Sequence, residues 1–160
     1  MRARRVASPA ACLLLFAIIV VGSHLPVVFD ATIRHQTLHD LEHGAYLIAG
    51  LAMWWPIHGD PEPRRRLGTI GALLYVTAAM LPMAVIGAFL NRDPTLFYRD
   101  YAGPARELGI SAVLNQQQAG AIMWVAGTTL MAAVGLAAVL SSMLAAERRQ
   151  RARELHEVAR

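Results

Sequence analysis

The segment HQTLHDLEHG, which starts at His35, places three histidines four residues apart with two acidic residues among them. Two imidazoles at positions i and i+4 of a helix can bind one metal ion, and histidine is the commonest metal ligand in proteins. His39 and His43 have this spacing, and Asp40 and Glu42 could orient the rings by accepting their second N–H groups. Ionisable side chains in a membrane segment mark functional sites by default. The segment therefore predicts a metal site with His39 and His43 as its primary ligands.

The point at which the helix begins decides how many histidines share one face. Thr37 and Asp40 fit a capping box, with Thr37 as N-cap, and this helix presents only the second and third histidines together. A helix capped by Asp30 would begin earlier and take in His35, so that all three histidines form one stripe. Both alternatives are open on the sequence. His35 and the upstream His24 are therefore candidates for an additional ligand.

Methionine and glutamine supply the remaining candidates. Met83 and Met123 are expected at the membrane depth of His43, and thioether sulfurs are soft ligands that select Cu(I). Methionine is also an ordinary filler of apolar cores, so packing is the alternative for each of them. Gln116 and Gln117 stand at the membrane boundary, where their amides could support the site or bind neighbouring helices. This donor set favours copper, as Cu(I), as the metal.

The same segment admits other interpretations. HDLEH matches the H-x-x-E-H zinc protease pattern, in which Glu42 would be the general base, but no third carboxylate ligand is evident on another helix. A haem-binding bundle is a second alternative, although its axial ligands usually come from facing helices. A membrane protein that holds no metal and uses the histidines for contact with a partner is the third.

The elements that position these residues are apolar enough to enter a bilayer. Of the 160 residues, 56% are hydrophobic, and the mean hydropathy is +0.40. A membrane-spanning helix needs about 20 apolar residues. We therefore predict an all-α, polytopic membrane helical bundle that forms one integral membrane domain and contacts lipid. Its four transmembrane helices are expected near residues 7–23, 38–57, 67–90 and 119–146, followed by a charged tail over 147–160.

The arginines predict the orientation of this bundle. All 15 basic residues are arginine. Most of them precede the first apolar run, separate the second from the third, or follow the fourth. By the positive-inside rule both termini are then cytoplasmic, and His24, His35, His39 and His43 lie at the outer face. Alternatively, the first apolar run is a signal peptide, whose cleavage would leave three helices with the histidines still outside.

The composition argues against nucleic-acid binding and against disulfides or cysteine-based metal sites. The isoelectric point is near 10.0, but the arginines are not interleaved with aromatic residues, so no nucleic-acid partner is expected. Cys12 is the single cysteine, so one chain cannot form a disulfide or a cysteine-based metal site.

Two blocks of the sequence carry a resemblance to a known family. HLPVVFDATIRHQTLHDLEHGAYLIAGLAMWWPI (24–57) followed by NQQQAGAIMWVAG (115–127) resembles the CtaG-like cytochrome c oxidase assembly factors of the caa-type system. The matching positions are His24, Pro26, Phe29, Asp30, His39, Glu42, His43, Trp54, Trp55, Pro56, Gln116, Gln117, Ala119, Gly120, Met123 and Trp124.

The resemblance implies a multi-pass protein of the bacterial cell membrane that is not an enzyme and that helps to load copper into the oxidase, whose subunits are its partners. Family members usually have more helices, so this short version would lack part of a site or need a partner, and a homo-oligomer is one option. Asn115 stands where the family often has an acid, and His35 matches no family position. Our leading hypothesis is copper binding by His39 and His43, helped by His24 or His35 and by Met123 or Met83.

Overall fold

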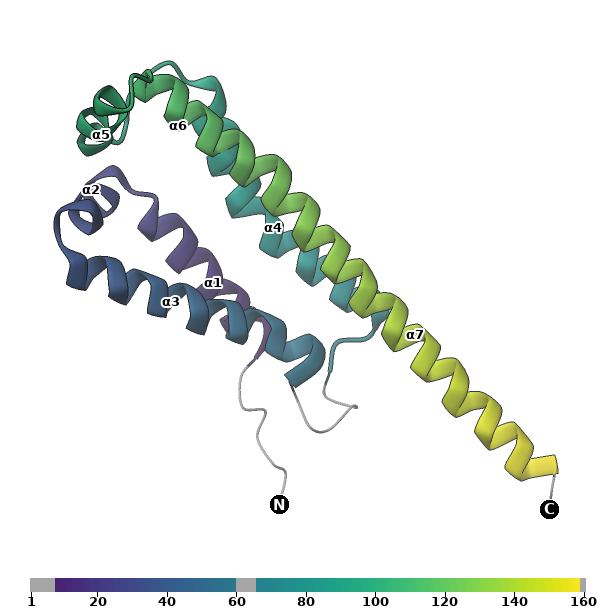
Figure 1. Cartoon of the computed structure of the whole chain (residues 1–160). Coiled ribbons are helices and arrows are strands. Elements are labelled where there is room, and N and C mark those ends of the chain that lie inside the picture. The colour runs from purple at the N-terminus through teal and green to yellow at the C-terminus, as the bar shows by residue number, and fades with distance from the viewer. Residues whose placement is uncertain (1–7, 60–65, 159–160) are drawn as a thin grey trace.

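A computed structural model describes residues 8–59 and 66–158, and all regular secondary structure in these ranges is helical (Figure 1). The N-terminal half forms α1 (Pro9–Ser23), α2 (Pro26–Arg34), α3 (Gln36–Trp54) and the π-helical turn η1 (Trp55–Gly59). The C-terminal half forms α4 (Thr69–Arg92), η3 (Arg99–Tyr101), α5 (Ala102–Glu107), α6 (Ala112–Ala121), the π-helical segment η4 (Ile122–Gly127) and α7 (Thr128–Val158). The predicted all-α fold is confirmed.

A sharp bend separates α1 from α2, and the local sequence explains it. Pro26 begins α2, and the residue before a proline is disfavoured in the helical region. Leu25 accordingly has an extended backbone, with φ −65° and ψ 130°. The two helices are bent by 71°, so α2 turns aside at one end of the molecule, and α3 then returns alongside α1 (Figure 1).

Each half of the chain packs on the other through one central helix. α1 contacts α3 on one side and α4 on another, while α4 contacts α6, η4 and α7. The core where they meet is apolar and includes Phe16, Met53, Ala79 and Val139. Met53 of α3 is only 1% exposed. Burial of apolar area therefore joins the two halves through the central pair α1 and α4.

α4 and α6 approach each other at the level of their backbones. A Cβ atom built on Gly120 would lie 2.7 Å from the backbone N of Asn91 and 2.7 Å from the backbone O of Gly87. A Cβ on Gly87 would in turn lie 2.7 Å from the backbone N of Trp124. Small residues permit such close helix contacts in membranes, so these two glycines fix the position of α6 and η4 on α4.

The number of membrane spans differs from the predicted four. Within the described ranges, two helices are long and apolar enough to cross a bilayer, Thr69–Arg92 and Ala112–Leu155, and a third span exists if the bent pair α1–α2 is counted as one. α1 alone has 15 residues, about 22 Å of helix against a hydrocarbon core of about 30 Å. α3 carries charged and histidine side chains in its N-terminal turns. The count of four is therefore not confirmed.

The boundaries of the last helix and of the segment after α1 also differ from the prediction. The helix expected from residue 119 begins at Ala112, because Ser111 caps it by accepting a hydrogen bond from the Leu114 N–H. The glutamines thus lie inside this helix. It continues to Val158 through most of the predicted tail, and α2 is an additional helix between the first two expected ones.

Candidate metal-binding site

The imidazoles of His39 and His43 lie side by side near the start of α3. Their ring centroids are 4.5 Å apart, with the planes tilted by 49°. Both side chains are exposed, and 47% of the His39 side chain is accessible. One ion could therefore reach both rings, as the i, i+4 spacing requires. Their role as ligands remains a prediction.

The two carboxylates beside the histidines have other hydrogen-bond partners. Asp40 accepts a bond of 2.7 Å from the Gln36 side-chain amide, and its Oδ1 is 4.0 Å from His39 Nδ1, beyond hydrogen-bond distance. The nearest printed contact of the Glu42 carboxylate is the Tyr46 hydroxyl oxygen, 3.4 Å from Oε1. Neither contact is to an imidazole N–H, so the predicted orienting role of Asp40 and Glu42 stays a prediction.

His35 lies outside the helix that carries the other two histidines. It is the N-cap residue of α3, with φ −129° and ψ 108°, and it is exposed. Thr37 is the second residue of the helix, so the predicted capping box is wrong, and so is the continuous stripe of three histidines. The extended backbone at His35 breaks the helix between α2 and α3, because the chain must turn there to lie along α1.

A second set of candidates meets in a cavity of about 300 Å³ between the α1–α2 bend and the segment of the C-terminal half that runs from the end of α4 to η4. Its lining includes His24 and Met123, which are separated by about a hundred residues in sequence. His24 Nδ1 lies 2.7 Å from the Val20 carbonyl oxygen. Because a carbonyl only accepts, Nδ1 carries a proton, so Nε2 is the ring nitrogen that remains for a metal ion. The hydrogen bond thus orients the His24 ring with Nε2 away from the Val20 carbonyl.

Met83 and Asp30 are not among the residues that line this cavity. Met83 packs against the apolar core, and its Cε lies 3.0 Å from the position of a Cβ on Gly127. Asp30 has one buried carboxylate oxygen without a hydrogen-bond partner within the described structure. None of these contacts joins Met83 or Asp30 to His39 or His43.

Tyr46 connects the exposed histidines to the cavity. Its hydroxyl donates a hydrogen bond of 2.7 Å to Ser23 Oγ, which lies 3.2 Å from His24 Nδ1. The Tyr46 ring centroid is 6.3 Å from that of His43. No role was predicted for Tyr46 from the sequence. Its position three residues after His43, on the same side of a helix, is the signal that could have found it.

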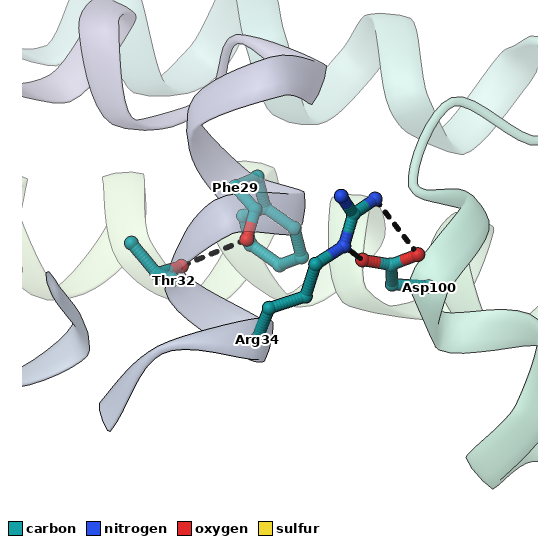
Figure 2. Close-up of polar contacts among 4 residues, drawn as sticks. All are labelled: Phe29, Thr32, Arg34 and Asp100. Carbon is teal, nitrogen blue, oxygen red and sulfur yellow. Dashed lines mark hydrogen bonds and ion pairs between the residues drawn. The ribbon is translucent and has the colours of Figure 1, made fainter.

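Residues of α2 and η3 contribute to the wall of the cavity. The rings of Phe29 and Tyr98 are 4.0 Å apart, and the Tyr98 hydroxyl donates a bond of 3.1 Å to the His24 carbonyl. The Arg34 guanidinium forms an ion pair with Asp100, as Figure 2 shows, and its Nη2 donates a second bond of 3.2 Å to the same carboxylate. Two segments that are far apart in sequence are therefore joined beside the cavity.

The described residues contain no cluster of three or more His, Cys, Asp or Glu side chains that could hold a metal ion. A metal on the histidine pair would therefore need further donors from water, a thioether or another molecule.

Comparison with known proteins decides the family. The family model of the cytochrome c oxidase caa3 assembly factors matches residues 1–145. The chain belongs to this family. No curated protein and no solved structure matches the chain.

Membership of the caa3 assembly factor family gives the coarse function. The chain takes part in the assembly of cytochrome c oxidase, which implies association with that oxidase and indicates a non-catalytic role. Its apolar helices indicate a membrane protein. The matched residues contain the histidine segment and the glutamine segment on which the resemblance was based.

In this assembly factor, Gln116 fixes the segment that covers the cavity. Its side chain, 6% exposed, donates a bond of 2.8 Å to the Thr95 carbonyl and accepts bonds from the Phe97 and Tyr98 N–H groups at 2.9 and 3.3 Å. Gln117 donates similarly to the Asp93 carbonyl. These contacts hold the backbone of residues 93–98. From the sequence, only a general supporting role was predicted for both glutamines.

Replacing Gln116 by alanine should lower the free energy of unfolding by roughly 2–3 kcal/mol, because buried backbone groups of the loop lose their partners. Gln118→Ala is the matched control, since Gln118 is exposed on the same helix. Thermal unfolding in mild detergent would measure both. An equal effect of the two substitutions would contradict the assigned role of Gln116.

Burial, followed by the nearby charges of Tyr46 and Asp30, raises the pKa of Tyr98 from its ordinary value of 10.0 to about 12. The neutral phenol is thus favoured in the folded state. Its contribution to stability is fully present below pH 10 and is lost as the pH rises from about 10 to about 12.

The melting temperature of the wild-type protein should therefore fall more steeply over this pH range than that of Tyr98→Phe, measured by thermal unfolding at several pH values. The variant also loses the bond to His24, which lowers stability at every pH, so the slope is the relevant quantity. Parallel curves of melting temperature against pH for the two proteins would contradict the raised pKa of Tyr98.

Proposed function

We propose that this caa3 assembly factor binds copper at the outer face of the membrane and helps to deliver it to the oxidase. The observation that carries the proposal is the contact between the His39 and His43 rings, 4.5 Å apart on an exposed helical face. Imidazole suits copper as a ligand, and two rings one helical turn apart can share one ion.

The openness of the histidine pair supports transfer in preference to storage. Both side chains are exposed, and no third His, Cys, Asp or Glu of the described residues completes a cluster with them. An ion held by two protein ligands keeps positions for donors from a partner. Copper can then pass to the oxidase by exchange of one ligand at a time.

The cavity beside α2 supplies a second pair of suitable donors. His24 offers Nε2, and Met123 offers a thioether in the same cavity. An imidazole with a thioether is a soft donor set, which favours Cu(I). The hydrogen bond from Tyr46 to Ser23 connects this pair with the α3 surface. We assign His24 and Met123 as auxiliary ligands, while His35 and Met83 have no contact that favours such a role.

The distribution of arginine supports the outer location. The two sequence connections expected on the side of His39 and His43 contain Arg34, Arg92, Arg99 and Arg106, whereas the other arginines of the sequence fall in the remaining segments. By the positive-inside rule, this distribution favours cytoplasmic termini. The proposal accordingly places copper capture on the side of the membrane opposite the arginine-rich ends.

Titration of the detergent-purified protein with Cu(I), in competition with a coloured chelator, tests the proposal. We expect about one ion per chain. Absence of binding would overturn it, and a Soret band in the absorption spectrum would indicate haem instead. In cells that lack the protein, oxidase activity should fall and should be restored by the wild-type chain.

A further inference from the structure

His24 stands at the carboxyl end of α1, where the last carbonyls of a helix have no partner within the helix. Val20 belongs to this last turn, and its carbonyl oxygen lies 2.7 Å from His24 Nδ1 and 3.0 Å from Ser23 Oγ. A carbonyl oxygen has two lone pairs, so it can accept both hydrogens. The free end of α1 therefore supplies the acceptor that orients the imidazole of His24.

Ser23 holds the same ring from a second side. Ser23 is only 7% exposed, and its Oγ lies 3.2 Å from His24 Nδ1. Because the hydroxyl donates its single hydrogen to the Val20 carbonyl, Oγ can offer only a lone pair to the ring N–H. The Nδ1–H group thus has two acceptors. A flip of the ring would put a C–H group in its place and would lose both.

Tyr46 of α3 fixes the hydroxyl group of Ser23 in turn. The Tyr46 hydroxyl donates a hydrogen bond of 2.7 Å to Ser23 Oγ. This bond occupies the other lone pair of Oγ and keeps the Ser23 hydrogen directed at the Val20 carbonyl. Tyr46 makes no hydrogen bond to His24 itself within the described structure. Any effect of its hydroxyl on the His24 ring therefore passes through Ser23.

His24 is the one histidine of the α1–α3 region whose ring is held in this way. Within residues 8–59 and 66–158 the rings of His35, His39 and His43 make no hydrogen bond, and His39 Nδ1 stays 4.0 Å from Asp40 Oδ1. A histidine that binds a metal almost always donates its other ring N–H to a carbonyl, a carboxylate or water. His24 has this arrangement before any metal arrives.

We propose that Ser23 and Tyr46 are positioning residues for His24 in copper binding. Ser23 holds the ring with Nδ1 against the Val20 carbonyl and Nε2 free for the metal, and Tyr46 acts through Ser23. The inference rests on the proposed copper function, in which His24 and Met123 are auxiliary ligands. Loss of a hydrogen bond that supports a metal-binding histidine typically costs about 10–100-fold in metal affinity.

Nitrogen NMR of isotopically labelled histidine rings in the detergent-purified full chain, without copper, is the first measurement. At alkaline pH the rings are neutral, and the His24 signal is assigned by its loss in H24Q. The wild type should show mainly the tautomer with Nδ1 protonated, and S23A should raise the share of the tautomer with Nε2 protonated. Y46F removes one oxygen from a partly exposed ring, so it guards against misfolding of S23A. It should shift the tautomers in the same direction by less.

Titration with Cu(I) against a coloured chelator is the second measurement. S23A should weaken Cu(I) binding by about tenfold, and Y46F by less, because the bond from Ser23 to Val20 survives. The double variant S23A/Y46F should bind no more weakly than S23A alone, since a residue that acts through Ser23 has no effect once the Ser23 hydroxyl is gone.

The matched control is S141A. Ser141 Oγ donates a bond of 2.8 Å to the carbonyl three residues earlier, as Ser23 does, but it belongs to α7 and does not line the cavity of His24. Both measurements should be unchanged in S141A.

An unchanged His24 tautomer in S23A would overturn the positioning role, whether or not copper binds. A shifted tautomer with unchanged Cu(I) affinity would overturn the role of Ser23 in copper binding, and additive losses in S23A/Y46F would overturn the action of Tyr46 through Ser23. Absence of Cu(I) binding by the wild type would overturn the copper function itself, while the NMR measurement would still decide whether Ser23 orients the His24 ring.

Discussion

Purified protein in which both His39 and His43 are replaced by alanine should bind no copper, whereas the wild-type chain should bind about one ion. The two rings are 4.5 Å apart and supply both protein ligands of the exposed pair. Their removal leaves no imidazole on this face of α3. Chelator competition in mild detergent would measure the loss as a fall in copper per chain from about one to none.

The control for this experiment is His58→Ala, because His58 is exposed and lies at the opposite end of the bundle. It should bind as much copper as the wild type. Since His39 and His43 are both exposed, their replacement should change stability by no more than about 0.5 kcal/mol. Unchanged copper stoichiometry in a folded double variant would refute the copper proposal.

Gly120→Leu should be the most destabilising single substitution considered for this chain. The added side chain would begin 2.7 Å from the backbones of Asn91 and Gly87, and backbone atoms cannot move aside as a flexible side chain can. Overpacking of this kind costs typically 1–3 kcal/mol and more where the backbone must shift. We expect a loss of at least about 3 kcal/mol, seen as a lower melting temperature in detergent.

Separation of α4 from α6 should also disturb the cavity, because Gln116, Ala119 and Met123 belong to the same helix as Gly120. The matched control is Gly50→Ala, also inside a helix, where a Cβ would meet no atom within 4 Å. That substitution should be neutral or slightly stabilising, because alanine favours the helix by about 1 kcal/mol. Equal melting temperatures for the two variants would contradict the close packing of α4 on α6.

The family relationship separates the general function of the chain from its chemistry. Assembly of cytochrome c oxidase follows from membership of the caa3 assembly factor family. Copper, its ligands and the orientation in the membrane are proposals that rest on the exposed histidine pair and on the arginines.

The boundaries of α3 illustrate where local sequence rules are insufficient. Thr37 and Asp40 have the residue types of a capping box, yet the helix begins at Gln36 and Asp40 binds the Gln36 side chain instead. A capping motif contributes only about 1 kcal/mol. The packing of α2 and α3 on their neighbours outweighs it, and the same packing decides that His35 stands outside the helix.

The sequence alone determined the features that depend on composition and on short spacing. Long apolar runs make a helical membrane protein because backbone groups in lipid must be satisfied within each segment, and an i, i+4 pair places His39 beside His43 wherever the helix begins. The tertiary structure decided everything that depends on contacts between distant segments. Three such contacts form only in the folded chain: His24 and Met123 line the same cavity, Gln116 binds the backbone of the segment before η3, and Arg34 forms an ion pair with Asp100.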